Sequence, residues 1–255
     1  MTLTLEEAAT ISRLKLVAAI GLVAVLVLLT AGSSAGAQSL MVLPVNVHMV
    51  PGQGATILTV VNEGKSETAI QIRAYAWNQP DGGDDQLTAS DAVIVSPPLA
   101  SIAAGGTQVV RLVLRKPPQG KEATYRIVLD QIPPPAEPGV VRVVLRLSIP
   151  VFAQPATRTA PHVQFRIERD GGQAFLVGFN DGNYHEAVRN IVLTTSNGHK
   201  LKTGTSTSPY ILAGATRRWP IDTQSSLPLP NESFRLTAHE DTGAIEEQVQ
   251  VASVP

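Results

Sequence analysis

The chain of 255 residues contains no cysteine, few aromatic residues and almost no net charge, at −1 near pH 7. Without cysteine there are no disulfides, no thiol nucleophiles and no thiolate metal ligands. The balanced and scattered charges argue against nucleic acid as a partner. After the N-terminal region, no stretch carries apolar residues at helical spacing over a dozen positions, which argues against amphipathic helices.

The N-terminal region has the pattern of an export signal. Arg13 and Lys15 precede the apolar run 16–32, and small residues follow it in an A-x-A pattern. This order predicts a signal peptide over residues 1–37 that is cleaved before Gln38. An uncleaved membrane anchor is the alternative, because the apolar run is close to the length that spans a bilayer.

Glycine and proline are plentiful and separate short runs of Val, Ile, Leu and Thr, which is typical of an all-β protein. In the first half, strands are predicted near residues 40–49, 55–62, 68–77, 92–95, 107–115, 123–131 and 140–153. In the second half, they are predicted near 163–169, 173–179, 190–196, 209–214, 216–221, 233–239 and 244–251. We expect an all-β fold of two immunoglobulin-like β-sandwich domains, at residues 38–155 and 156–255.

Motifs that would indicate an enzyme or a cofactor site are missing. The chain has no phosphate-binding GxxxxGK(S/T) loop, no GxSxG nucleophile motif and no metal-ligand spacing among its five histidines. The acidic run DGGDD at 81–85 lacks the ligand spacing of an EF-hand loop and is predicted to be a solvated turn. We therefore expect no enzyme activity, cofactor, nucleotide or metal. An exported hydrolase stays open as an alternative, because separate Ser, His and Asp residues can assemble in a fold.

The stretch GVVRVVLRLSIPVF at residues 139–152 has an unusual pattern. Its odd positions from Val141 to Val151 are all aliphatic, and it contains Pro150. Proline cannot donate a ladder hydrogen bond and is confined to edges, strand starts and bulges, so we expect an edge strand. An edge of this kind invites another chain to pair with it. The alternative is that the aliphatic row only faces its own core.

Three stretches of the first half resemble the periplasmic pilus-assembly chaperones of the chaperone/usher pathway. They are YRIVLDQIPP at 125–134, VSPPLASIAAGGTQVVRLV at 95–113 and VVNEGKSETAIQIRAYAW at 60–77. SIPVF at 148–152, taken with YRI, is similar to the archaic branch, which is associated with spore-coat-U-like subunits. The resemblance implies two sandwich domains arranged as an L-shaped (boomerang) pair and a location in the periplasm.

In this family the G strand of the first domain is lent to a pilus subunit whose own sandwich lacks a strand. The residues implied to enter the open core of the subunit are Val141, Val143, Leu145 and Leu147. Ile149 and Val151 are expected to stay in the protein's own core or hinge. The implied partners are pilus, fimbrial or spore-coat-U-like subunits and an outer-membrane usher. The resemblance also implies that the subunits are bound and delivered without ATP. The same edge would also allow the free form to associate with itself.

The better-known members of the family hold the C-terminal carboxylate of the subunit with an arginine on the first strand and a lysine late in strand G. In this sequence Asn46 and Pro150 align with those two positions, so the usual pair is missing. For the archaic branch the resemblance implies Arg126 as the anchor, since a guanidinium can bind a carboxylate through two parallel N–H bonds. Arg73 and Arg111 are weaker candidates. A purely structural role for Arg126 is the alternative.

A second class of function also stays open. The chain could be an exported structural or adhesive β-sandwich protein that resembles a pilus subunit. Such subunits usually carry a detachable N-terminal donor segment and one incomplete domain, and neither pattern is evident in this sequence. Self-polymers after purification would favour that class.

Overall fold

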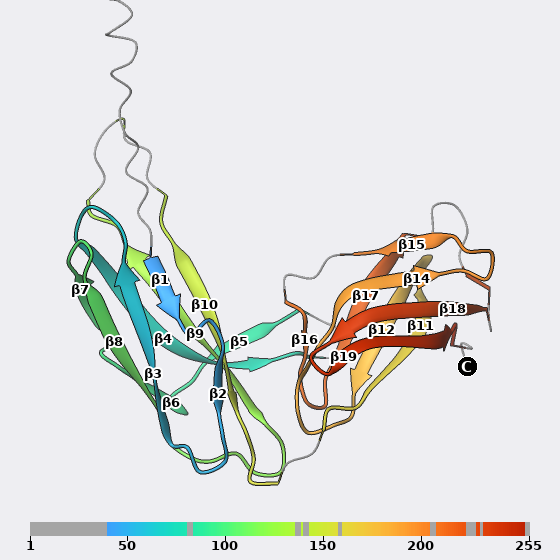
Figure 1. Cartoon of the computed structure of the whole chain (residues 1–255), viewed down its shortest axis with the longest axis horizontal. Coiled ribbons are helices and arrows are strands. Elements are labelled where there is room, and N and C mark those ends of the chain that lie inside the picture. Colours follow the sequence, from blue (N-terminus) through green and yellow to red (C-terminus); the bar gives the residue numbers. More distant parts are fainter. Residues whose placement is uncertain are drawn as a thin grey trace, which may run out of the picture. The chain divides into compact units, whose positions relative to one another are not determined.

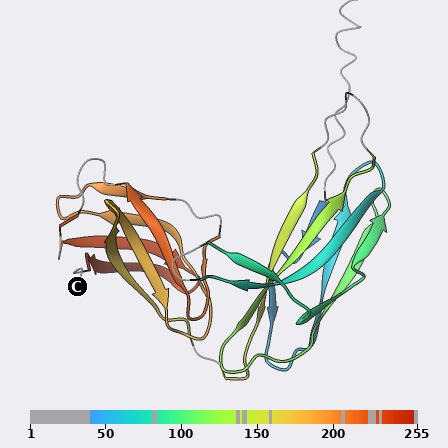
Figure 2. The same ribbon diagram turned by 180° about the vertical axis from the view of Figure 1, so that it is seen from behind.

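The structure is a computed structural model that describes residues 40–80, 84–135, 139, 143–157, 160–204, 208–222, 228–229 and 232–252. All regular secondary-structure elements in these residues are β-strands. The described part of the chain contains no helix long and apolar enough to cross a bilayer. The strands form two groups, coloured blue to yellow-green and yellow to red in Figure 1 and seen from behind in Figure 2. The predicted signal peptide over 1–37 lies outside the described residues.

The first group is a β-sandwich of two sheets. One sheet has the strand order β1-β3-β8-β6, and the other has the order β2-β10-β9-β4-β5, with β7 also paired to β4. The strands are β1 (Leu40–Leu43), β2 (Val47–Met49), β3 (Ala55–Asn62), β4 (Thr68–Asn78), β5 (Gln86–Ala89), β6 (Val93–Ser96), β7 (Leu99–Ile102), β8 (Thr107–Leu114), β9 (Ala123–Ile132) and β10 (Arg146–Ala153).

The core of this sandwich follows from the period-two pattern of its strands. Leu58 and Val60 of β3 are completely buried, whereas Ile57, which has the opposite parity in the same strand, is half exposed. Ile127 and Leu129 of β9 close the core from the opposite sheet. Alternate residues of a strand point to opposite faces, so each strand contributes one row to the core and one to an outer face.

The second group is a seven-stranded sheet in the order β11-β12-β17-β15-β14-β18-β19, with a separate β13-β16 pair. Its first and last strands meet, because Ile167 bridges to Val251 and accepts a hydrogen bond from the Ala252 amide (2.7 Å). The strands are β11 (Val163–Asp170), β12 (Gln173–Asn180), β13 (Glu186–Ala187), β14 (Arg189–Thr194), β15 (Lys200–Thr203), β16 (Tyr210–Ile211), β17 (Thr216–Asp222), β18 (Ser233–Glu240) and β19 (Gly243–Gln250). Phe234, Leu236 and Trp219 are among the residues of its core.

The predicted all-β sandwich fold is confirmed, but several strand predictions are wrong. The single strand predicted over 40–49 is two strands in different sheets, β1 and β2, and of the strand predicted over 209–214 only β16 forms. The strand predicted over 140–153 begins at Arg146 among the described residues. Its partner β9 ends at Ile132 and is followed by prolines at 133–135. A proline at 133 has no N–H to continue the ladder opposite Val143, which explains why regular pairing stops there.

Candidate functional site

Strand β10 is an edge strand for the first part of its length. It pairs with β9 from Arg146 to Ala153, but β2 covers its other side only from Val151 to Ala153. In the described part of the chain, no strand pairs with residues 146–150 on the side away from β9. The edge position predicted from Pro150 is therefore confirmed.

Two hydrogen bonds define which main-chain groups face the open side. The Gln131 amide donates to the Leu145 carbonyl (2.9 Å), and the Gln154 amide donates to the Met49 carbonyl on β2 (2.9 Å). Odd positions of β10 thus bond to β9, whereas even positions face away from it. The missing N–H of Pro150 consequently falls on the open side and costs no bond to β9.

The side chains predicted to enter a partner differ in their exposure. Val143 is 79% exposed, whereas Leu145 and Leu147 are half-buried. Leu147 packs against the core of its own sandwich. Ile149 and Val151, expected in the core, are buried there. Val141 lies outside the described residues.

The outer face of the same sheet carries a row of large side chains at the C-terminal end of β10. Trp77 and Phe152 have the opposite parity to the core residues of their strands, yet they are completely buried. They lie in one row across β9, because Phe152 pairs with Thr124, and Thr124 donates its hydroxyl to the Trp77 carbonyl (2.7 Å). A buried outer face means that another part of the molecule covers it.

Side chains of the second sandwich cover this row. Trp77 and Phe152 share a hydrophobic cluster with Tyr210 and Leu212, and the Tyr210 ring lies 5.1 Å from Phe152. Gln79 links the backbones on both sides, since its amide donates to the Tyr210 carbonyl (2.8 Å) and accepts from the Leu212 amide (2.9 Å). We call this contact between the two sandwiches the junction.

A buried acid and a buried histidine meet at the junction. Glu122 of the first sandwich accepts a hydrogen bond from His185 of the second, with 2.7 Å between Oε2 and Nδ1. The His185 ring is stacked on Phe152, with 3.6 Å between their centroids. His48 is stacked nearby, and burial together with the charge of His185 lowers the pKa of His48. Within the described residues, no group of acidic and histidine side chains could hold a metal ion.

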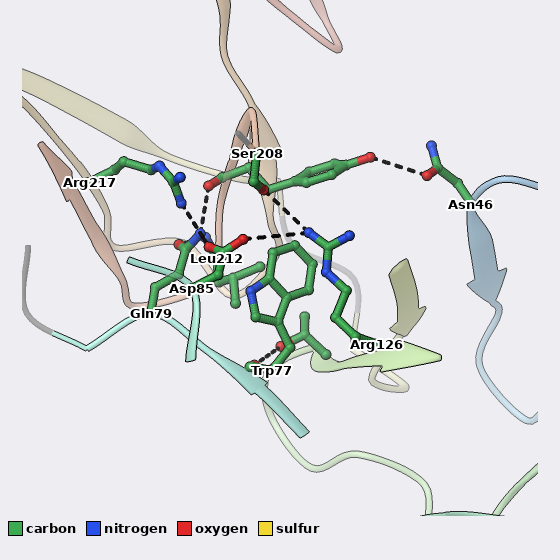
Figure 3. Close-up of polar contacts among 10 residues, drawn as sticks. Asn46, Trp77, Gln79, Asp85, Arg126, Ser208, Leu212 and Arg217 are labelled. Atoms are coloured by element: carbon green, nitrogen blue, oxygen red, sulfur yellow. Dashed lines mark hydrogen bonds and ion pairs between the residues drawn. The ribbon is translucent and has the colours of Figure 1, made fainter. Parts of the chain in front are cut away.

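An ionic cluster joins the sandwiches beside Trp77 (Figure 3). The Asp85 carboxylate contacts Nη1 of Arg217 at 2.8 Å and Nη2 of Arg126 at 3.6 Å, and it accepts a hydrogen bond from Gln79 at 2.9 Å. The side chains of Arg126, Arg217 and Asp85 are 12%, 6% and 22% exposed. A single carboxylate is thus shared by two nearly buried guanidinium groups.

Burial and charge compete in this cluster. Burial opposes ionisation of Asp85, but the hydrogen bonds from Gln79 and Arg217 outweigh it and hold the pKa of its carboxyl below the usual value. Burial lowers the pKa of Arg126, and Asp85 only partly offsets that effect. The guanidinium of Arg126 also lies over the Trp77 ring, 3.7 Å from its centroid (Figure 3).

The structure places the other predicted anchor residues as follows. Arg126 pairs with Pro150 across β9 and β10, so the two positions lie side by side on one face. Asn46 accepts a long hydrogen bond from the Tyr210 hydroxyl (3.4 Å). Arg73 is paired with Asp130 (2.5 Å) and Arg111 is exposed, so neither belongs to the junction cluster.

Sequence reasoning missed the partners of Arg126. The sequence predicts a solvated turn over 81–85; this prediction is wrong for Asp85, which is bonded to Gln79 and Arg217, and residues 81–83 lie outside the described residues. Arg217 lies 132 positions from Asp85, and no local spacing relates such distant residues. Trp77 and Phe152 did carry a usable signal, because each places a large apolar side chain on the polar parity of its strand.

Comparison with solved structures identifies the class of fold. A chain of the CsuC–CsuE chaperone–tip adhesion subunit pre-assembly complex, from the archaic chaperone-usher Csu pili of Acinetobacter baumannii, is 23% identical with a TM-score of 0.64, over 85% of this chain and 100% of that one. The E. coli chaperone DraB is 20% identical (TM-score 0.53; 86% and 97%). A chain of the Salmonella enterica SafA pilin complex with the SafB chaperone is 16% identical (TM-score 0.56; 86% and 99%). These similarities show the two-domain β-sandwich fold of such chaperones.

The sequence of the first sandwich also matches a known domain family. Residues 39–158 match the N-terminal domain of the pili and flagellar-assembly chaperones of the PapD type. No curated protein matches the chain. The first sandwich is therefore similar in sequence to the N-terminal domain of PapD-type chaperones for pilus assembly.

Proposed function

We propose that this protein is a periplasmic chaperone of the archaic chaperone/usher branch. It binds pilus, fimbrial or spore-coat-U-like subunits by donating β10 to their incomplete sandwiches, and it delivers them to an outer-membrane usher without ATP. Residues 1–37 act as its signal peptide, and residues 38–155 and 156–255 are its two domains. The observation that carries this proposal is the open edge of β10 within a sandwich that matches the N-terminal domain of PapD-type chaperones.

The open part of β10 can offer both hydrogen bonds and apolar side chains. The main-chain groups of Arg146 and Ser148 face the side without a partner strand, so a subunit strand can pair there. Val143, Leu145 and Leu147 share one parity, and Val141 continues their row toward the N-terminus. Each aliphatic side chain buried in a subunit contributes roughly 1.5 to 3 kcal/mol before ordering costs.

Arg126 is proposed as the anchor for the C-terminal carboxylate of the subunit. It lies directly opposite Pro150, a buried residue that is the last one without a second partner strand before β2 begins to pair with β10. A strand added to that edge would lie two strand spacings, about 10 Å, from β9. A chain that ends beside Pro150 therefore brings its carboxylate into the neighbourhood of the Arg126 side chain.

Co-expression with a candidate spore-coat-U-like subunit from the same genome tests strand donation. Val143→Glu and Leu145→Glu should each weaken the one-to-one complex roughly 10- to 100-fold, because a charge replaces an apolar anchor. The matched control is Ile94→Glu, which places the same charge on an exposed apolar position of the other sheet. If both β10 variants retain a stable complex in size-exclusion chromatography, strand donation by these residues is wrong.

A further inference from the structure

The anchor residue is not available in the arrangement that the structure shows. Arg126 is on β9, and its guanidinium lies over Trp77 of β4, the strand on the side of β9 opposite β10. It is therefore turned away from the open edge of β10. A subunit carboxylate beside Pro150 can reach Arg126 only after this side chain changes its contacts.

Asp85 is the charged group that holds Arg126 in this position. Its carboxylate is itself fixed by shorter contacts on the other oxygen, from Arg217 at 2.8 Å and from Gln79 at 2.9 Å. The contacts that Arg126 makes are longer, at 3.6 Å to Asp85 and 3.4 Å to the Ser208 hydroxyl. Asp85 is thus secured independently of Arg126, and Arg126 is the more weakly held partner.

The polar contacts of Arg126 are longer than those of an ideal guanidinium–carboxylate pair. A guanidinium and a carboxylate form two parallel N–H bonds of about 2.7 to 2.9 Å when they meet in plane. The contacts of 3.4 and 3.6 Å that Arg126 makes to Ser208 and Asp85 both exceed that range. A second carboxylate that approaches in plane would therefore bind Arg126 more tightly than Asp85 does.

We propose that Asp85 is an internal carboxylate ligand that occupies Arg126 in the free protein and that the C-terminal carboxylate of the subunit displaces. This inference rests on the proposed function, because it assumes that Arg126 is the anchor. Its consequence is specificity: binding is favoured only for a chain end whose carboxylate can compete with Asp85. An internal segment, which has no terminal carboxylate, would leave Asp85 in place.

Asp85→Asn tests the competition because it removes the charge and preserves the size of the side chain. The probe is one purified subunit prepared in two forms, with a free C-terminal carboxylate and with a C-terminal amide. Asp85→Asn should tighten binding of the carboxylate form at least about fivefold and leave binding of the amide form unchanged. Asp91→Asn is the matched control, since Asp91 is 87% exposed and gives the same change in net charge.

A second measurement needs no variant and covers the case that Asp85→Asn does not fold. The ¹³C signal of the Asp85 carboxyl, followed against pH in the wild-type protein, should titrate at a higher pH once the carboxylate subunit is bound, because Asp85 has lost Arg126. The amide subunit should not cause this change. An unchanged Asp85 titration in both complexes would overturn the inference.

The possible failures are distinguishable. If the wild type prefers the carboxylate form but Asp85→Asn does not tighten its binding, Asp85 is no competitor and the anchor role of Arg126 still stands. If the wild type binds both forms equally, the anchor and the competition are both wrong. Strand donation is then still decided separately by the variants of Val143 and Leu145.

Discussion

The two sandwiches end their sheets in different ways. In the second, the first and last strands meet at Ile167 and Val251, and the Ala252 amide donates across the gap. In the first, β10 has a complete partner in β9 but is covered by β2 only from Val151 onward. The same chain thus closes one sheet and leaves part of another open.

This difference separates stability from binding. An unpaired edge exposes main-chain donors and acceptors, and natural proteins usually cover or shorten it. Residues at the closed end are buried and should contribute mainly to folding. Residues 143–148 at the open end are exposed or half-buried, and they should contribute mainly to partner binding. Variants at the closed end should therefore lower the free energy of unfolding, whereas variants at the open end should weaken partner binding.

The largest effect is expected where the second sheet closes. Ile167→Ala removes a completely buried side chain from the second core and should lower the free energy of unfolding by about 2 to 5 kcal/mol. Denaturant unfolding of the intact chain measures it. Ile94→Ala, at an exposed position, should stay within about 0.5 kcal/mol of wild type. If Ile167→Ala lowers the free energy of unfolding no more than Ile94→Ala does, the proposed difference between the closed and the open end is wrong.

A smaller effect is expected at the open main chain. Ser148→Pro removes an N–H that faces away from β9, and it should weaken subunit binding roughly two- to tenfold with little change in unfolding. Ser148→Ala retains the N–H and is the control. Isothermal titration of both variants decides the matter: equal loss in the two would mean that the Ser148 amide does not pair with the subunit.

The exposed apolar side chain at the open end should matter little for folding. Val143→Ser changes a side chain that is 79% exposed, so its unfolding midpoint in denaturant should shift by the equivalent of less than about 0.5 kcal/mol. A clearly larger loss of stability would show that Val143 belongs to the core of its own protein and not to a donated row.

The smallest effect is expected at the covered end of β10, where His48 of β2 is stacked on Phe152. Burial lowers the pKa of His48, so the unfolded chain binds a proton more readily than the fold does. The stabilising effect is therefore complete above the ordinary histidine pKa of about 6.5 and declines as the pH falls below it. Thermal unfolding between pH 7.5 and 5.5 should show this slope, and His48→Gln should flatten it.

Much of the fold could be predicted from local pattern. Strand β3 has the predicted bounds of 55–62, because Leu58 and Val60 alternate with partly exposed residues. The strands that the sequence does not predict are short or exposed: β5 is exposed at every position, β7 and β15 have four residues each, and β13 has two. The start of β10 could not be predicted from its own aliphatic pattern, which extends to Val141. It is set by the partner strand β9, because the prolines at 133–135 end the pairing between the two strands.

The candidate site was less predictable than the fold. The parity of Arg126 on β9 could be read from the sequence, but Asp85 and Arg217 meet it only through contacts between the two sandwiches. Those contacts depend on the order of strands in each sheet, which no local pattern contains. The burial of Trp77 has the same cause, because the second sandwich covers a face that alternation assigns to solvent.

The short length of the open edge also bears on how a partner would be released. Arg146 and Ser148 each offer a donor and an acceptor on that side, and Pro150 offers only an acceptor before β2 blocks the strand. Main-chain bonds contribute about 0.5 to 1.5 kcal/mol each, so this handful of bonds holds a strand only weakly by itself. Replacement of β10 by a competing strand that fills the same apolar pockets of the subunit better would then lower the free energy. Such an exchange would need no energy from nucleotide hydrolysis.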